Sequence, residues 1–214
     1  MLNLSNYLSI KNEVSSISNK ATIIAVSKNF PMDFIKTLIN HGHNHFGENK
    51  VQEAKYKWTD FLKEKTNIKL HMIGKLQSNK VKDAFKIFDY IHTLDNQKIA
   101  QILSNLESNF DKKLKYFIQV NIAGEQQKTG IDPELAGDFI KYCRLDLGLN
   151  IIGLMCLPPI NENPIFYFNK LKTLAHENNL SELSMGMTND YIEAVKNGST
   201  YLRIGSGIFG LRSN

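Results

Sequence analysis

A lysine follows directly after an apolar run near the start of the chain. Residues 23–26, with the sequence IIAV, are typical of a strand that is buried on both faces, and Ser27 and Lys28 come next. Once it has lost its proton, a lysine amine attacks an aldehyde or ketone carbon and forms a Schiff base. The alternative is a lysine that extends from the strand end into water, and position alone favours that alternative.

Glycines and hydroxyl side chains gather in two segments at the other end of the chain, "LSMGMTND" (183–190) and "RIGSGIFG" (203–210). Glycines let backbone N–H groups approach an anion, and serine or threonine hydroxyls add further donors. Single segments of this kind also occur as ordinary turns between a strand and a helix. Because the two occur together, we interpret them as a phosphate site. A phosphate site opposite Lys28 predicts a phosphorylated aldehyde as the ligand.

The elements that position these residues follow a regular pattern. Short apolar runs, which predict strands, alternate with longer amphipathic segments, which predict helices. Such alternation implies parallel strands, and eight strands after an initial helix at about residues 3–18 predict an α/β fold, a single (β/α)8 TIM barrel. The alternative is an open doubly wound sheet, but its G-x-G-x-x-G nucleotide motif follows none of the runs. The predicted strands are 22–27, 44–47, 69–74, 90–94, 115–122, 150–157, 183–186 and 201–206.

In such a barrel the functional residues lie at the carboxyl ends of the strands. Lys28 follows the first predicted strand, and Glu48 and Asn49 follow the second. Arg203 precedes the glycine-rich end of the last strand, which favours an orientation into the barrel mouth over a surface ion pair. We therefore expect Lys28 and Arg203 to face the same cavity.

Composition limits the other classes of function. The 214 residues include 42% hydrophobic and 22% charged residues, which is ordinary globular usage, and no linker interrupts them, so we expect one domain over 1–214. The net charge is +5 with lysines scattered along helical segments, which predicts no nucleic-acid partner. No apolar run approaches the roughly 20 residues that span a membrane. With no signal-peptide core and with Cys143 and Cys156 outside any CxxC pair, we expect a cytoplasmic protein that does not bind membranes.

Two further motifs were weighed as binding sites. His43 and His45 alternate along an extended segment and could share a metal, but a third ligand is not evident, and we predict no metal site. The stretch "IGKLQS" (73–78) resembles part of a phosphate-binding loop. It lacks the first glycine at the required spacing and a serine or threonine directly after the lysine, so that interpretation is rejected.

Seven motifs, in order along the chain, resemble those of the pyridoxal phosphate homeostasis proteins, single-domain relatives of the alanine racemase barrel. Any one of them would be a weak signal, but together they cover nearly the whole chain. The resemblance implies a fold like the N-terminal domain of alanine racemase. The motifs are "AVSK" (25–28), "HFGENKVQE" (45–53), "HMIGKLQSNK" (71–80), "FIQVNIAGEQQKTGI" (117–131), "GLMCLP" (153–158), "LSMGMTND" (183–190) and "RIGSGIFG" (203–210).

The resemblance implies that the cofactor is pyridoxal 5′-phosphate, held by Lys28 as a Schiff base. It implies that Arg203 faces the ring nitrogen and that Asn49 and Met155 lie close to the ring. Lys75 replaces the usual proline of its loop, and Asn189 replaces a residue that is often acidic or small. Thr188 replaces a commoner serine and keeps the hydroxyl. The implied residues on the phosphate and pyridine side are Thr188, Arg203, Gly205 and Ser206.

Three functions fit this set of residues. An arginine at the ring nitrogen keeps the ring neutral and weakens it as an electron sink, and racemisation needs a second acid–base group, which alanine racemase takes from an additional domain. We therefore expect a non-enzymatic protein that maintains pyridoxal phosphate homeostasis, with PLP-dependent apo-enzymes as partners. The family suggests a monomer. The alternatives are a PLP-dependent amino acid racemase of low activity and an aldolase that uses Lys28 on a phosphorylated sugar without a cofactor.

Overall fold

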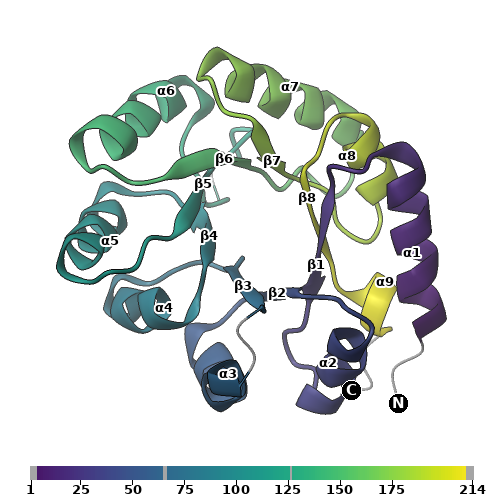
Figure 1. The fold of residues 1–214 in the computed structure, drawn as a ribbon. Helices are drawn as coiled ribbons and strands as arrows, with labels where there is room; N and C mark the ends of the chain where they lie inside the picture. The colour runs from purple at the N-terminus through teal and green to yellow at the C-terminus, as the bar shows by residue number, and fades with distance from the viewer. Residues whose placement is uncertain (1–3, 65–66, 126, 211–214) are drawn as a thin grey trace.

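A computed structural model describes residues 4–64, 67–125 and 127–210 of the chain. Within these residues, eight parallel strands each pair with the next in sequence, and β8 pairs with β1, so the sheet closes into a barrel. The predicted (β/α)8 fold is confirmed, and Figure 1 shows the helices outside the ring of strands. The strands are β1 (Thr22–Val26), β2 (His45–Glu48), β3 (Lys69–Met72), β4 (Tyr90–Leu94), β5 (Lys115–Gln119), β6 (Ile151–Met155), β7 (Glu182–Ser184) and β8 (Tyr201–Ile204).

Three of the helices begin directly after a residue whose side chain caps them. Asn96 accepts a hydrogen bond from the N–H of Ile99, and Pro133 and Pro164 occupy first-turn positions behind capping Asp132 and Asn163. The α-helices are α1 (Leu4–Ile17), α2 (Met32–Asn40), α3 (Val51–Glu64), α4 (Val81–Ile87), α5 (Gln97–Asn109), α6 (Pro133–Lys141), α7 (Pro164–Glu177), α8 (Tyr191–Lys196) and α9 (Ser206–Phe209), with a 3-10 turn η1 (Ser78–Lys80) and a π-helical turn η2 (Tyr142–Asp146).

The strands alternate their side chains between the surrounding helices and the barrel interior. In β3, Leu70 and Met72 belong to the large core between strands and helices, whereas His71 between them faces inward and contacts His92 of β4. This period of two is the geometry of a pleated strand. A smaller cluster inside the barrel contains Tyr90, Phe117 and Met155.

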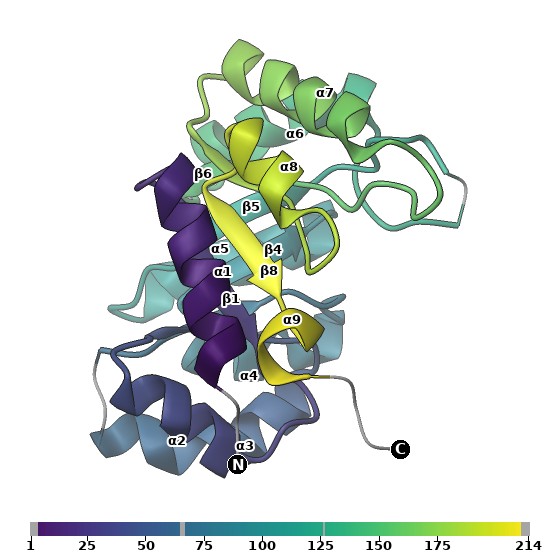
Figure 2. The ribbon, with the colours of Figure 1, turned by 90° about the vertical axis from the view of Figure 1, so that its right-hand side faces the viewer.

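Helix α1 lies outside the strand–helix repeat. Figure 2 shows it along the outside of β8, next to α8 and α9. Its buried residues Tyr7, Ile10 and Val14 are spaced three and four apart, so one face of the helix covers this side of the barrel. The predicted initial helix is therefore confirmed.

Several predicted strands continue beyond the ends seen in the structure. The prediction over 201–206 is wrong at its end, because β8 stops at Ile204 and Ser206 begins α9. Gly205 turns the chain between them with φ −109° and ψ −85°. The apolar pattern runs past the last paired residue, and a four-residue helix is too short to produce a periodic signal.

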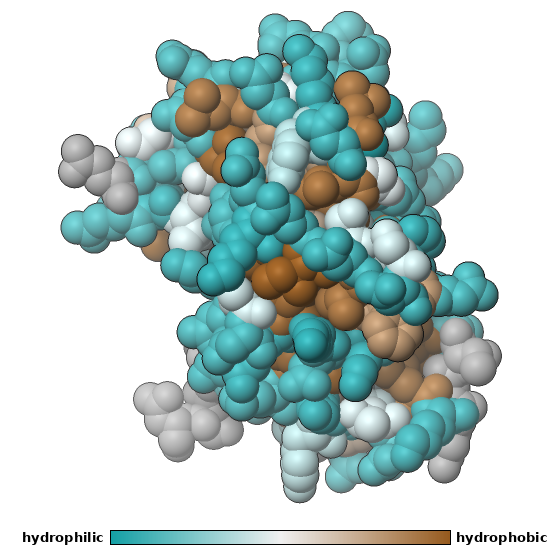
Figure 3. All heavy atoms as spheres, turned by 90° about the vertical axis from the view of Figure 1, so that its left-hand side faces the viewer, coloured by the Kyte–Doolittle hydropathy of each residue, from teal (hydrophilic) through white to brown (hydrophobic). Residues whose placement is uncertain are grey.

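The outer surface is mostly polar. On the face in Figure 3, which is the left-hand side of Figure 1, hydrophobic side chains form patches between hydrophilic ones. That distribution is ordinary for a globular surface. Within the described part of the chain, every helix is too short or too polar to cross a membrane.

Candidate functional site

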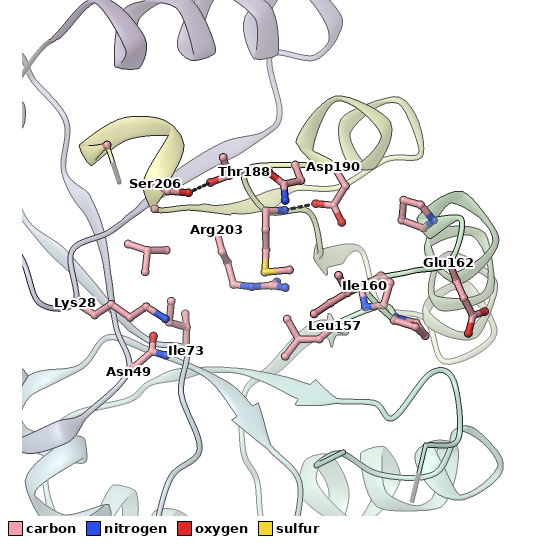
Figure 4. A pocket seen from close by; sticks show the side chains of 18 of the residues that line it. Lys28, Asn49, Ile73, Leu157, Ile160, Glu162, Thr188, Asp190, Arg203 and Ser206 are labelled. Carbon is pink, nitrogen blue, oxygen red and sulfur yellow. Dashed lines mark hydrogen bonds between the residues drawn. The ribbon is translucent and has the colours of Figure 1, made fainter. Parts of the chain in front are cut away.

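A cavity of about 900 Å³ lies at the carboxyl ends of the strands. Its walls come from residues at or just after the ends of β1, β2, β3, β6, β7 and β8. Figure 4 shows the polar side chains arranged around it. Six of the seven predicted site residues line this cavity: Lys28, Asn49, Thr188, Arg203, Gly205 and Ser206.

Lys28 stands in a tight turn directly after β1. The N–H of Phe30 donates to the carbonyl of Ser27 at 3.1 Å, and Asn29 between them has a φ of +64°. Asparagine tolerates this left-handed conformation better than most residues. The Asn29 N–H donates to Glu53 Oε1 of α3 at 2.5 Å. The turn directs the Lys28 side chain into the cavity, as Figure 4 shows.

A buried ionic cluster behind the turn fixes the residue that precedes Lys28. Lys57 Nζ of α3 donates to the Ser27 carbonyl at 2.8 Å, to Glu48 Oε1 at 2.9 Å and to Glu53 Oε1 at 3.1 Å. Glu48 Oε1 also accepts from Ser27 Oγ at 2.7 Å and from Trp58 Nε1 at 3.0 Å. Burial acts to raise the pKa of Glu53, but the bonds from Asn29 and Lys57 dominate and lower it. The cluster therefore favours the charged form of the Glu53 carboxylate beside Lys57.

Asn49 lines the cavity, and the loop after β3 passes very close to its backbone. A Cβ at Gly74 would lie 2.2 Å from the carbonyl oxygen of Asn49, so only glycine fits there. The N–H of Ile73 donates to the carbonyl of Glu48 at 3.0 Å, which joins the ends of β2 and β3. Asn49 Oδ1 is buried and makes no hydrogen bond within the described residues. This oxygen is available to a ligand donor.

Arg203 forms part of the cavity floor and is 5% exposed. Its NH1 donates to Ser184 Oγ at 2.6 Å, and its NH2 donates to the carbonyl of Cys156 at 2.9 Å. Burial lowers the pKa of Arg203, but a guanidinium keeps its proton in proteins. Both acceptors are neutral, and no carboxylate among the described residues forms an ion pair with Arg203. A buried cation that lines a cavity under these conditions favours a ligand with an acceptor atom or a negative charge.

Two hydroxyls meet at the wall formed by the last two strands. Ser206 Oγ donates to Thr188 Oγ1 at 3.3 Å, and the N–H of Gly207 donates to the same Thr188 oxygen at 3.2 Å. The Asp190 carboxylate accepts from the N–H of Met187 at 2.6 Å, and this bond closes the loop that carries Thr188. Burial raises the pKa of Asp190. The two hydroxyls and the turn at Gly205 form a small cradle of hydrogen-bond donors.

Three residues singled out from the sequence lie elsewhere or at the rim. Met155 is fully buried at the end of β6, packed with Tyr90 and Phe117, and is not among the described residues that line the cavity. Lys75 is exposed and also lies off the cavity wall. Asn189 is exposed and does line the cavity. Contact of Met155 with a bound ring remains a prediction.

The rings of His43 and His45 do not face a common point at which they could share a metal ion. His43 Nε2 contacts the carbonyl of His45 at 2.7 Å and its Nδ1 contacts the Tyr7 hydroxyl at 3.2 Å, whereas the His45 ring enters the barrel. The two rings therefore point to different sides of β2. Over residues 4–64, 67–125 and 127–210, no three His, Cys, Asp or Glu side chains are placed to hold a metal ion.

Sequence reasoning missed three residues that support the site: Ser184, Lys57 and Glu53. Ser184 stands in a motif that was already singled out, two positions before a glycine. Alternation along β7 identifies it, because Leu183 packs outward and the next residue must face the barrel interior. Lys57 and Glu53 are one helical turn apart on α3. Opposite charges at positions i and i+4 of a predicted helix indicate an ion pair, and this spacing is the sequence feature that could have identified them.

Comparisons with known proteins agree with this geometry. The family described as "Alanine racemase, N-terminal domain" matches residues 4–213. The chain is 37% identical over 205 residues to the pyridoxal phosphate homeostasis protein of Haemophilus influenzae, covering 91% of this chain and 86% of the relative. It is 32% identical over 220 residues to the protein of the same name from Schizosaccharomyces pombe, covering 95% and 90%.

Solved structures share this fold over nearly the whole chain. PipY of Synechococcus elongatus is 32% identical, with 96% of this chain and 98% of PipY covered. The TM-score is 0.88 for PipY without PLP and 0.85 for PipY with PLP bound. Alanine racemase of Clostridium difficile is 13% identical with a TM-score of 0.73 over 58% of its length, which shows a shared fold. The chain belongs to the family of pyridoxal phosphate homeostasis proteins, within the larger group that shares the N-terminal domain of alanine racemase.

Proposed function

We propose that this protein binds pyridoxal 5′-phosphate as a Schiff base on Lys28 and maintains the cellular pool of that cofactor without catalysis. One observation carries the proposal: Lys28, Arg203 and the Thr188–Ser206 hydroxyl pair line a single cavity. Its relatives named pyridoxal phosphate homeostasis protein, and the PLP-bound structure of PipY, support the identity of the ligand.

The residues present fit the chemical groups of the cofactor. Lys28 would hold the aldehyde through its amine, in a condensation that releases one water and requires the amine to give up its proton. The Thr188 and Ser206 hydroxyls donate to phosphate oxygens, and Gly205 leaves their side of the wall without a side chain. The N–H groups of Arg203 that Ser184 and Cys156 do not engage would donate to the ring nitrogen, an acceptor. When bound, the cofactor supplies an electron-withdrawing ring conjugated to the lysine nitrogen.

Arg203 also supports a role in holding the cofactor over a role in catalysis. A carboxylate at the ring nitrogen would keep that nitrogen protonated and strengthen the ring as an electron sink, whereas a guanidinium donates and leaves it neutral. The two carboxylates that line the cavity already accept hydrogen bonds. Glu162 accepts from the Tyr167 hydroxyl, and Asp190 accepts from the Met187 N–H. These bonds tie both carboxylates to the segments that carry them.

The same proposal includes the partners. A protein that holds a reactive aldehyde and does not consume it must release it, and the recipients are PLP-dependent apo-enzymes. Ile160 at the cavity rim is 95% exposed, so the mouth of the site is accessible from solvent. We propose that the protein acts as a monomer of one domain in the cytoplasm.

A racemase of low activity is the second candidate, since the fold is that of alanine racemase and Lys28 occupies the mouth of the barrel. Incubation of the loaded protein with a panel of L-amino acids, followed by chiral analysis, separates the two. The homeostasis proposal expects D-isomer formation no faster than with free pyridoxal phosphate. Robust turnover that disappears in Lys28→Ala would refute it.

A further inference from the structure

A line of hydrogen-bonded side chains crosses the barrel interior and ends at Arg203. His45 Nδ1 lies 2.9 Å from His71 Nε2, and His71 Nδ1 lies 2.9 Å from His92 Nε2. His92 Nδ1 then lies 2.8 Å from Ser184 Oγ, which accepts from Arg203 NH1 at 2.6 Å. We call His45, His71 and His92 the histidine column. It begins at the first residue of β2 and reaches the floor of the cavity.

The column is enclosed by aromatic rings. His71 stacks on Tyr90 with ring centroids 4.2 Å apart, and His92 stacks on Phe117 at 4.3 Å. Both imidazoles are fully buried. Burial holds the pKa of each well below its ordinary value, and the nearby charge of Arg203 further lowers that of His92. Both are therefore neutral, and a neutral imidazole has one N–H donor and one nitrogen acceptor.

The interior of a (β/α)8 barrel is ordinarily filled by branched aliphatic side chains. An aliphatic interior here would leave the buried Ser184 hydroxyl and the guanidinium with too few partners, at a cost for each unsatisfied group. The histidine column places polar atoms where aliphatic side chains would otherwise pack, and each ring is hydrogen-bonded to the next. Polar packing of this kind needs a function that aliphatic packing cannot provide.

Arg203 fixes the direction of every hydrogen bond in the column. A guanidinium only donates, so Ser184 Oγ must accept from it. The Ser184 hydroxyl hydrogen then needs an acceptor of its own, and His92 Nδ1 is the one within reach in the described part of the chain. With Nδ1 accepting, His92 carries its hydrogen on Nε2 and donates to His71 Nδ1. By the same reasoning His71 accepts on Nδ1, carries its hydrogen on Nε2 and donates to His45 Nδ1.

We propose that Ser184 and His92 are positioning residues for Arg203, and that the histidine column is polarised in one direction with a hydrogen on Nε2 of His71 and of His92. The column holds the lone pairs of Ser184 toward the guanidinium, so NH1 is anchored there, while the Cys156 carbonyl anchors NH2 and the group lines the cavity. The claim that this orientation of Arg203 serves a ring nitrogen rests on the function proposed above. The direction of the hydrogen bonds in the histidine column does not depend on that function.

The direction is measured without any cofactor. The probe is ¹⁵N-histidine-labelled protein, unliganded and at neutral pH, in which ring nitrogens with and without hydrogen are resolved by NMR. Signals are assigned with His71→Gln and His92→Asn. Hydrogen on Nε2 of both rings supports the proposal. Hydrogen on Nδ1 of His92, or a protonated ring in the column, overturns it.

A matched pair of variants tests the positioning role. In His92→Asn the amide group replaces Nδ1 and can still accept from Ser184. In His92→Gln it replaces Nε2, and the bond to Ser184 is lost. The readouts are the NMR signal of Arg203 Nε–H in unliganded protein and the Kd for pyridoxal phosphate.

We expect His92→Gln and Ser184→Ala to shift the Arg203 signal and to weaken binding by about tenfold, the effect of one lost hydrogen bond. We expect His92→Asn to retain both properties within about twofold. Equal behaviour of the Asn and Gln variants, with folding verified by circular dichroism, overturns the positioning role. If wild-type protein fails to bind pyridoxal phosphate, the proposed function fails, and the tautomers and the Arg203 signal still decide the inference.

Discussion

Lys57 Nζ donates a hydrogen bond of 2.8 Å to the carbonyl oxygen of Ser27, the residue before Lys28. The same ammonium group contacts the carboxylates of Glu48 and Glu53, at 9% exposure of the Lys57 side chain. A lysine from α3 thus sets the position of a lysine at the end of β1. The backbone next to Lys28 is therefore held by a charge cluster that lies outside the cavity.

Replacement of Lys57 by Met tests how much the cluster of Lys57, Glu48 and Glu53 stabilises the fold. Loss of the ammonium leaves the buried Glu48 carboxylate without its cation, and removal of one partner from a buried ion pair destabilises by about 3 kcal/mol or more. We expect urea unfolding to show that loss. Lys55→Met is the matched control, because Lys55 is on the same helix and forms an exposed pair with Asp83. Equal stabilities of the two variants would contradict the assigned role of the cluster.

Removal of either hydroxyl of the Thr188–Ser206 pair should weaken recognition of the phosphate group selectively. We expect Thr188→Val and Ser206→Ala each to raise the Kd for pyridoxal phosphate by about tenfold, because each removes one donor to a charged group. The affinity for pyridoxal, which lacks the phosphate, should not change. Titrations followed by absorbance measure both ligands, with Ser108→Ala on the exposed face of α5 as the control. Equal losses for both ligands would exclude the cradle as the phosphate site.

The buried histidines predict a loss of stability in mild acid. Burial lowers the pKa of His43 from 6.5 to about 4, so below pH 6.5 the unfolded chain binds a proton that the folded chain does not. Stability is therefore fully present above pH 6.5 and falls as the pH decreases toward 4. From His43 alone the loss is about 3 kcal/mol over that window, and His71 and His92 act in the same direction.

Urea unfolding at several pH values across that window measures the effect. We expect His43→Gln to reduce the slope of stability against pH, whereas the same exchange at the exposed His41 should leave it unchanged. A slope in His43→Gln as steep as in the wild-type protein would contradict the assigned role of the buried His43 imidazole.

The sequence was sufficient for the fold and for placing six residues on one cavity, because both depend on local patterns. A continuous apolar run such as β1 and a periodic helix such as α2 are visible in the sequence, and the alternation of strands and helices leaves few topologies. The carboxyl-end rule then brought Lys28 and Arg203 to one cavity. Ser206 was placed in a strand although it begins α9, because four residues carry no periodic signal.

The histidine column could not be read from the sequence. His45 and His71 are 26 residues apart, His71 and His92 are 21 apart, and Ser184 lies 92 residues beyond His92. Each stands singly on its own strand, where an isolated histidine usually means an ordinary buried side chain. Only the register between neighbouring strands, which pairs Gly47 with His71, brings the rings into line.

The measurement that tests the central claim most directly is the absorption spectrum of purified protein after addition of pyridoxal phosphate, followed by borohydride reduction and peptide mass spectrometry. We expect a visible band in the wild-type protein, its loss in Lys28→Ala, and a reduced pyridoxyl group on the peptide that contains Lys28. An undiminished band in Lys28→Ala, or a modification on a different lysine, would contradict the account.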